Sequence, residues 1–185
     1  AILGDLDIGS VTLRLNSRRL MWRLLEEVGV ASEDAQTEVL REVDKLEKKG
    51  TDAVGRTLVD SGLTPETVAR LLEWTAVEAS GVPEIEAGRA ENEAAEVAEV
   101  ARTMAALGVP EDTFALDLSI ARGLDYYTGT VYETRLDDHP ELGSICSGGR
   151  YDDLAGQYTT TRLPGVGISI GFTRLFWQLR EAGLL

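Results

Sequence analysis

The sequence predicts an α+β fold: an antiparallel sheet with flanking helices and an all-helical inserted subdomain. Three observations predict it. Hydrophobic residues alternate with polar ones near both ends of the chain, as in half-buried strands, whereas helical spacing fills the middle. Short turns join the strands of the last third, which favours antiparallel pairing over crossover connections. The predicted parts are residues 1–30, 31–110 and 111–185.

A strand followed by a helix is predicted for residues 1–30, as the first part of the sheet domain. Alternating residues give way to leucines four positions apart, which places one apolar stripe of the helix against a core. Asn16 or Ser17 can cap this helix, and Gly29 can end it.

Residues 31–110 are predicted to be helical throughout. Ser32 can cap a first helix whose acidic start and basic end complement the helix dipole, and Gly50 stops it. A short helix follows, Thr64 caps a third, and a long helix runs from about residue 85 to residue 107. This part groups no titratable residues for chemistry, so we interpret it as an inserted structural subdomain.

Strands return in residues 111–185, the predicted second half of the sheet domain. They are expected at residues 114–118, 128–135, 144–147 and 165–170. Gly171 leads the last strand into a helix whose apolar face is formed by Phe172, Leu175, Phe176 and Leu179.

Composition and charge limit the possible functions. A length of 185 residues suffices for one well-buried domain, or for one domain with a small subdomain. The 18 basic and 32 acidic side chains give a net charge of −14, which argues against binding of a nucleic-acid backbone by this chain alone. No apolar run approaches the length of a membrane span. The single Cys146 cannot form an internal disulfide, and this fits a reducing cytoplasm.

The first candidate site segment surrounds Arg122. A fixed guanidinium suits oxyanions such as phosphate, so Arg122 is a candidate phosphate ligand. Its alternative role is a local ion pair with Asp125 or Asp117 across a turn. Tyr126 and Tyr127 are adjacent on a chain expected to be extended, so they should face different environments, one of them a pocket.

The second candidate segment follows at residues 147–153. Gly148 and Gly149 at a strand end allow the backbone either to approach a small ligand closely or to turn. Tyr151 offers a phenol with a hydrogen-bonding tip. The adjacent carboxylates of Asp152 and Asp153 lack further ligands around them, so no metal site is predicted.

The third candidate segment is a strand with alternating glycines, Gly165, Gly167 and Gly171. Their spacing differs from that of the dinucleotide-binding fingerprint, in which the glycines lie in a turn after the strand. Glycines on one strand face either leave a flat floor for an aromatic ligand or let a helix pack tightly. Arg174, in the first turn of the next helix, can stack on a base or reach a phosphate. Cys146 has no histidine nearby to activate it and is expected to be a small buried residue.

These segments, in this order, resemble the second half of the catalytic domain of histidyl-tRNA synthetases. Arg-Gly-Leu-Asp-Tyr-Tyr-Thr-Gly-Thr-Val-Tyr-Glu at 122–133 and Ser-Gly-Gly-Arg-Tyr-Asp at 147–152 are similar to the histidine-specific segments of that family. Gly-Val-Gly-Ile-Ser-Ile-Gly-Phe-Thr-Arg-Leu at 165–175 resembles its class II motif 3. The resemblance covers nearly the whole chain and implies part of a class II antiparallel sheet.

The resemblance implies a role for each matched residue. Arg122 would be the catalytic arginine that neutralises charge at the α-phosphate while the histidine carboxylate attacks ATP. The implied histidine-binding residues are Tyr126, Tyr127, Gly148, Gly149 and Tyr151, with Tyr127 contacting the imidazole. The implied ATP-binding residues are Arg122, Gly171 and Arg174. ATP is the implied substrate and Mg²⁺ the implied metal, with no ligand for it assigned here. Histidine and tRNA(His) are the other implied partners, in a cytoplasmic homodimer.

The chain also departs from the family pattern. Motif 1, motif 2 and the anticodon-binding domain are not in it, and Thr173 stands where motif 3 usually has a glutamate. The chain is therefore expected to hold about half of one active site and to be inactive alone. The alternative is the synthetase-like regulatory subunit of ATP phosphoribosyltransferase, which also lacks an anticodon-binding domain. An intact segment 122–127 argues against that alternative, because a binding-only subunit does not need a phosphate-directed arginine.

Overall fold

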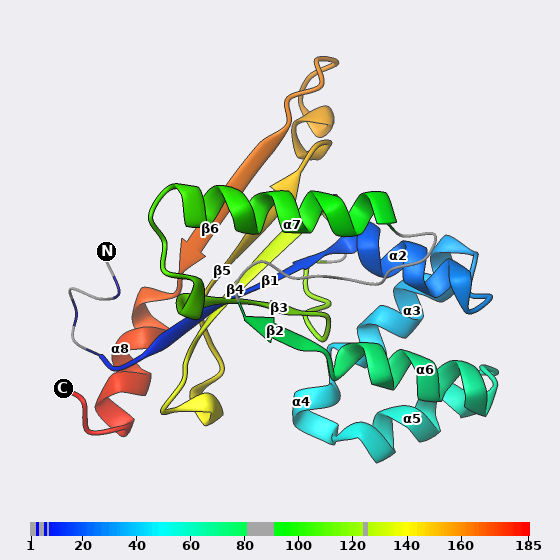
Figure 1. The fold of residues 1–185 in the computed structure, drawn as a ribbon, viewed down its shortest axis with the longest axis horizontal. Coiled ribbons are helices and arrows are strands. Elements are labelled where there is room, and N and C mark those ends of the chain that lie inside the picture. The colour runs from blue at the N-terminus through cyan, green and yellow to red at the C-terminus, as the bar shows by residue number, and fades with distance from the viewer. Residues whose placement is uncertain (1–2, 4–5, 7, 81–90, 124–125) are drawn as a thin grey trace.

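The centre of the fold is a mixed β-sheet. The structure is a computed structural model that describes residues 3, 6, 8–80, 91–123 and 126–185. Within these residues, six strands pair in the order β2–β3–β1–β4–β5–β6 (Figure 1). They are β1 (Val11–Ser17), β2 (Glu78–Ser80), β3 (Phe114–Asp117), β4 (Thr130–Leu136), β5 (Ser144–Tyr151) and β6 (Gly165–Ile170).

Strand pairing is antiparallel as predicted, except between β1 and β3. These two strands are parallel, with Leu13 opposite Phe114 and Leu15 opposite Leu116. The whole helical segment connects them, which gives the chain the length that a parallel crossover needs. The short strand β2 lies within the part predicted to be helical throughout and pairs antiparallel with β3. All four residues of β3 are buried, not half of them, because Phe114 and Leu116 pack in hydrophobic clusters and Asp117 pairs with Arg14.

The helices follow most of the predicted caps. They are α2 (Arg18–Glu27), α3 (Glu33–Val43), α4 (Leu46–Lys49), α5 (Thr51–Asp60), α6 (Pro65–Thr75), α7 (Glu91–Ala106) and α8 (Phe172–Glu181). The side chains of Ser17, Ser32 and Thr64 cap α2, α3 and α6. The helix predicted to end at Gly50 is broken into α3 and α4 at Asp44. Residues 85–90 of the predicted long helix lie outside the described residues.

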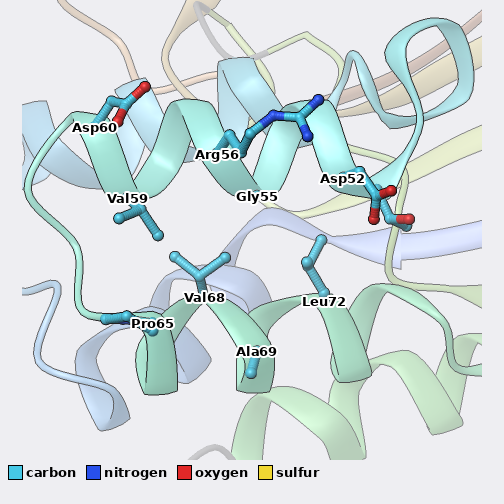
Figure 2. Close-up of a pocket in the computed structure, with 10 residues that line it drawn as sticks. Asp52, Gly55, Arg56, Val59, Asp60, Pro65, Val68, Ala69 and Leu72 are labelled. Carbon is cyan, nitrogen blue, oxygen red and sulfur yellow. The ribbon is translucent and has the colours of Figure 1, made fainter.

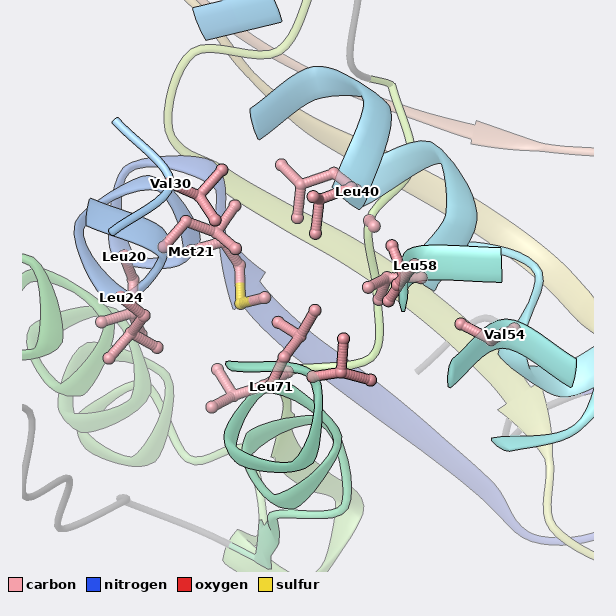
Figure 3. Packing of buried hydrophobic residues seen from close by; sticks show 14 of the residues in the cluster. Leu20, Met21, Leu24, Val30, Leu40, Val54, Leu58 and Leu71 are labelled. Carbon is pink, nitrogen blue, oxygen red and sulfur yellow. The ribbon is translucent and has the colours of Figure 1, made fainter. Parts of the chain in front are cut away.

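The largest cluster of buried side chains joins the helices α3, α5 and α6 to α2, α7 and β3 (Figure 3). Leu20 and Leu25 of α2 and Leu71 of α6 are completely buried. Burial of a leucine side chain contributes about 1.5–3 kcal/mol, so this cluster fixes the helical segment against one end of the sheet. Figure 1 shows α3 to α6 grouped beside that end.

Helices α7 and α8 each add a smaller cluster of buried residues. Ala101 of α7 packs on Leu15 and Phe114, and Figure 1 shows α7 crossing the sheet. Leu175 and Leu179 of α8 pack with buried residues of β4 and β5. The other half of the predicted apolar face of α8 is exposed, with 78% of Phe172 and 48% of Phe176 accessible.

Cys146 lies in the cluster beneath α8 and is buried, as predicted. Burial raises the pKa of its thiol, which keeps the sulfur protonated and unreactive. Among the described residues, no helix is long and apolar enough to span a bilayer.

Candidate active site

The candidate site lies on one face of β4, β5 and β6. Alternate residues of a strand point to the same face, so cross-strand register identifies the side chains that share it. Two neighbouring rows on this face are Val131–Gly149–Gly167 and Glu133–Ser147–Ser169. Leu15 and Tyr132, which pack with α7, belong to the opposite face. One face of the sheet is therefore packed against a helix, and the other presents small and polar residues.

Tyr127 lies against two glycines on the candidate face. A Cβ atom added to Gly149 would lie 2.8 Å from Tyr127 Cδ1, and one added to Gly123 would lie 2.0 Å from Tyr127 Cδ2. Gly123 also has a φ of +67°, which favours glycine. Burial, followed by a hydrogen bond with Tyr126, raises the pKa of Tyr127, so its phenol stays neutral. Both glycines are needed for the ring to occupy this place.

The prediction that the chain is extended at Tyr126 and Tyr127 is wrong. The N–H groups of both residues donate to the Gly123 carbonyl, at 3.2 and 2.9 Å, so the chain turns here and is not extended. Their ring centroids lie 4.2 Å apart. The two rings therefore form one aromatic pair, of which Tyr126 is the more exposed member.

Gly148 and Gly149 lie within β5, not at its end. β5 continues to Tyr151 and pairs with both neighbouring strands, which excludes the predicted turn. A Cβ at Gly148 would lie 2.2 Å from the Gly167 carbonyl oxygen, so this glycine permits close approach of β6. Both glycines instead permit close packing within the protein, Gly148 against β6 and Gly149 against Tyr127, and close approach of a ligand stays a prediction.

Tyr151 covers the glycines of β6. A Cβ at Gly165 would lie 2.4 Å from Tyr151 Cε2, and one at Gly167 would lie 3.3 Å from Tyr151 Cε1. The glycine face of β6 is thus covered by an aromatic ring of the chain itself. We had predicted either a closely packed helix or an open surface for an aromatic ligand. Tyr127 and Tyr151 stand on neighbouring glycine positions of the same face.

Arg122 is surrounded by three carboxylates, one on β4 and two from the helical segment. Its Nε lies 3.2 Å from Glu133 Oε2 and 3.5 Å from Asp44 Oδ1, and its Nη2 lies 4.0 Å from Glu47 Oε2. The predicted pair with Asp117 is wrong, because Asp117 accepts a hydrogen bond of 2.9 Å from Arg14. Asp125, the other predicted partner, lies outside the described residues.

Arg122 and Arg174 line the same cavity. Its volume is about 630 Å³, and its lining includes Asp44 and Glu47 as well as the start of β5. Gly171 does not line the cavity but stands at the N-terminal end of α8, where its carbonyl accepts the hydrogen bond of Leu175. The structure thus brings the two predicted phosphate-binding arginines together. None of the predicted tyrosines lines this cavity, but Gly123, next to Arg122 in the chain, lies against Tyr127.

Comparison with known proteins places this arrangement in a family. A sequence model of "Histidyl-tRNA synthetase" matches residues 1–175. The chain belongs to the histidyl-tRNA synthetase family. The histidine–tRNA ligases of Stenotrophomonas maltophilia (strain K279a) and Xylella fastidiosa (strain 9a5c) are 52% and 46% identical to it across the whole chain. The chain spans 43% of the length of each of these relatives.

Solved structures agree with the family. The histidyl-tRNA synthetase from Nostoc sp. PCC 7120 superposes with a TM-score of 0.91 at 37% identity, over all of this chain and 45% of that one. A protein from Bacillus halodurans described as "ATP phosphoribosyltransferase regulatory subunit/histidyl-tRNA synthetase" gives a TM-score of 0.72 at 20% identity, over 96% of this chain and 47% of that one. The second similarity shows a shared fold alone.

Three polar residues at the junction of β1 and α2 were not predicted as part of the site. Asn16 Nδ2 donates to the Ile120 carbonyl at 2.7 Å, just before Arg122. Arg18 Nη1 donates to the Tyr127 carbonyl and Arg19 Nε to the Thr128 carbonyl, each at 3.0 Å. The loop that carries Arg122 and the tyrosines is therefore held at both ends. A signal existed in the sequence, because two arginines in the first turn of a helix oppose its dipole.

Asp152 also stabilises the loop that carries Arg122 and the tyrosines. Its carboxylate accepts hydrogen bonds from Arg19, Arg150 and Thr128 at 3.0–3.1 Å, and only 2% of the residue is exposed. Burial alone would raise the pKa of Asp152, but the hydrogen bonds from Arg150 and Thr128 outweigh it and lower the pKa. Asp152 is thus an anchor for the loop. No group of three or more potential metal-ligating side chains occurs among the described residues.

A second cavity, of about 480 Å³, lies between α5 and α6 (Figure 2). Val59, Val68 and Leu72 give it an apolar wall, and Asp52 and Arg56 stand at its edge. None of the residues predicted for the site lines it.

Proposed function

We propose that this chain forms part of the catalytic domain of a histidine–tRNA ligase. In the first reaction, the histidine carboxylate attacks the α-phosphorus of ATP, which gives histidyl-adenylate and releases pyrophosphate. In the second, a hydroxyl of the tRNA(His) 3′-terminal ribose attacks the activated carbonyl and AMP leaves. The curated relatives named histidine–tRNA ligase, at 46–52% identity over the whole chain, support this activity.

The observation that carries the proposal is the cavity shared by Arg122 and Arg174. In this proposal Arg122 neutralises the charge that develops on the α-phosphate, and Arg174 holds the nucleotide. Such fixed charges accelerate adenylate formation because they stabilise the transition state without reorganising. Gly171 contributes by placing Arg174 at the start of α8. No covalent intermediate with the protein is needed.

The tyrosines are proposed to form the histidine pocket beside this cavity. Tyr127 and Tyr151 present aromatic rings on glycine positions, which suits a flat imidazole. Tyr126 lies against Tyr127 and forms the exposed rim. Gly148 and Gly149 allow the rings and strands to pack this closely.

Several partners belong to the proposal for the complete protein. Histidine, ATP and tRNA(His) would be its substrates, in a cytoplasmic homodimer. The described residues offer no carboxylate cluster that fits Mg²⁺, so we assign it no ligand and no step. We also propose that residues 31–110, which are helical except for β2 among the described residues, are an insertion between residues 1–30 and 111–185 of the catalytic domain. The separate grouping of α3 to α6 beside the sheet supports this division (Figure 1).

The test is histidine-dependent exchange of pyrophosphate into ATP by the full-length protein that carries this chain. The proposal predicts exchange with histidine and no exchange with other amino acids. A regulatory subunit of ATP phosphoribosyltransferase, the alternative function, would show no exchange and would alter the activity of that transferase. The 185-residue chain alone is predicted to show no exchange, because about half of the site lies outside it.

A further inference from the structure

Asp44 and Glu47 bring carboxylates from the helical segment to Arg122. Asp44 Oδ1 lies 3.5 Å from Arg122 Nε, and Glu47 Oε2 lies 4.0 Å from Arg122 Nη2. The second oxygen of Glu47 accepts a hydrogen bond of 2.9 Å from Arg135 Nη1 on β4. Both acids also line the cavity shared by Arg122 and Arg174. The helical segment, in which we predicted no grouping of titratable residues, therefore reaches the candidate site.

Glu133 completes a ring of alternating charges with these groups. It is 1% exposed, its Oε1 accepts a hydrogen bond of 3.0 Å from Arg135, and its Oε2 lies 3.2 Å from Arg122 Nε. A buried carboxylate is costly unless cations compensate it, so Glu133 restricts both arginines. Glu47 joins the same two arginines on the other side of the ring. Arg122 is thus held from the sheet by Glu133 and from the helical segment by Glu47 and Asp44.

The turn between α3 and α4, which carries Asp44 and Glu47, is stabilised by its own contacts. Glu42, 7% exposed, accepts hydrogen bonds from Lys45 at 2.6 Å and from Lys49 at 2.9 Å, and Val43 is completely buried. These contacts span the break between α3 and α4 that the sequence did not predict. The break places Asp44 at the end of α3 and Glu47 in α4, so both can reach one guanidinium.

We propose that Asp44 and Glu47 are positioning residues for Arg122. The inference rests on the catalytic role proposed for Arg122. A long arginine side chain loses conformational freedom when it meets a phosphate, and partners that already hold it reduce that loss. The helical segment thus sets the orientation of the guanidinium, while Arg122 itself contacts the substrate. The contrary role, competition of the acids with ATP for Arg122, makes the opposite prediction for ATP binding.

The experiment is a double-mutant cycle on pyrophosphate exchange by the full-length protein. Glu47→Gln removes the charge and keeps the shape, and it is measured alone and together with Arg122→Ala. We expect Glu47→Gln to lower kcat about tenfold with little change in the KM for ATP, as a misplaced catalytic group does. In the Arg122→Ala background the same substitution should change the rate less than about twofold, because no guanidinium remains to be positioned.

Control variants distinguish a loss of positioning from a loss of folding. Glu38→Gln, on the exposed face of α3, should leave kcat and melting temperature unchanged. If Glu47→Gln does not fold, as judged by its melting temperature, Asp44→Asn replaces it in the same cycle. Equal rate losses in both backgrounds would overturn the inference, and so would a lower KM for ATP with kcat intact. Absence of exchange in the unmodified protein would instead overturn the proposed function itself.

Discussion

The two halves of the candidate site are organised by different forces. Around Tyr127 and Tyr151, aromatic rings lie on Gly149 and Gly165 and occupy the space that a Cβ would need. Around Arg122, the partners are carboxylates at 3.2–4.0 Å, and the guanidinium is partly exposed. The tyrosine side is shaped by steric packing, and the arginine side by charge.

This difference predicts how each half responds to substitution. A packed aromatic pocket determines which molecule fits, so changes there should act on the KM for histidine. A charged group that meets developing charge should act on kcat. The following predictions, from the largest effect to the smallest, test that division in the full-length protein.

Arg122→Ala should give the largest effect. We expect histidine-dependent pyrophosphate exchange to slow by about 10²–10³-fold, mainly in kcat, because one transition-state charge partner is lost. Arg102→Ala is the control, since Arg102 lies on α7 and pairs only with nearby Glu99 among the described residues. An unchanged rate in the Arg122 variant would remove the catalytic role proposed for this residue.

Gly149→Ala should act mainly on histidine binding. The new Cβ would lie 2.8 Å from Tyr127 Cδ1 and 2.9 Å from the Thr130 carbonyl oxygen, so the ring or the strand must move. We expect the KM for histidine to rise about tenfold, equivalent to about 1.4 kcal/mol, with little change in the KM for ATP. Gly156→Ala, where a Cβ meets nothing within 4 Å, is the matched control. Equal changes in both KM values would contradict a division between the two halves.

Asp152→Asn tests the anchor that the two halves share. Loss of its charged hydrogen bonds should lower the free energy of unfolding by about 1–3 kcal/mol at pH 7, as measured by urea denaturation. The folded state lowers the pKa of Asp152, so its contribution is present above the usual carboxyl pKa of about 4 and is lost as pH falls below it. The variant should therefore lose less stability on acidification. Asp153→Asn, at an exposed neighbour, should match the unmodified protein in both respects.

Tyr127→Phe should have the smallest effect near neutral pH. The folded state raises the pKa of this phenol, so its contribution to stability is full below about pH 10 and is lost as pH rises further. The variant should lose less stability than the unmodified protein between neutral and strongly alkaline pH. Tyr158→Phe, at a residue that is 89% exposed, should not alter this dependence. The same pH dependence in both variants would contradict the packed environment of Tyr127.

Features that depend on neighbouring residues could be predicted from the sequence. The serine caps of α2 and α3 and the buried Cys146 follow from neighbouring residues. Features that depend on residues distant in the sequence could not be predicted. Nothing near β1 indicates its parallel partner β3, because about 100 residues separate them.

The contacts of the site residues could not be predicted from the sequence for the same reason. The alternative role for Arg122 was an ion pair with Asp125 or Asp117, which are close in sequence, but Arg14 on the neighbouring strand pairs with Asp117. No glycine or proline marks the break at Asp44, so the turn that reaches Arg122 could not be seen. The glycines of β6 carry Tyr151 because β5 and β6 pair in one particular register, which only the folded sheet defines.

The central claim is that the arginine cavity and the tyrosine pair form one histidine-activating site. The most direct measurement is a crystal structure of the full-length protein with ATP and histidinol, a histidine analogue that lacks the reacting carboxylate. We expect Arg122 to lie within hydrogen-bonding distance of the α-phosphate and the imidazole to lie against Tyr127 and Tyr151. An α-phosphate beyond the reach of Arg122, or an imidazole bound away from both tyrosines, would contradict it.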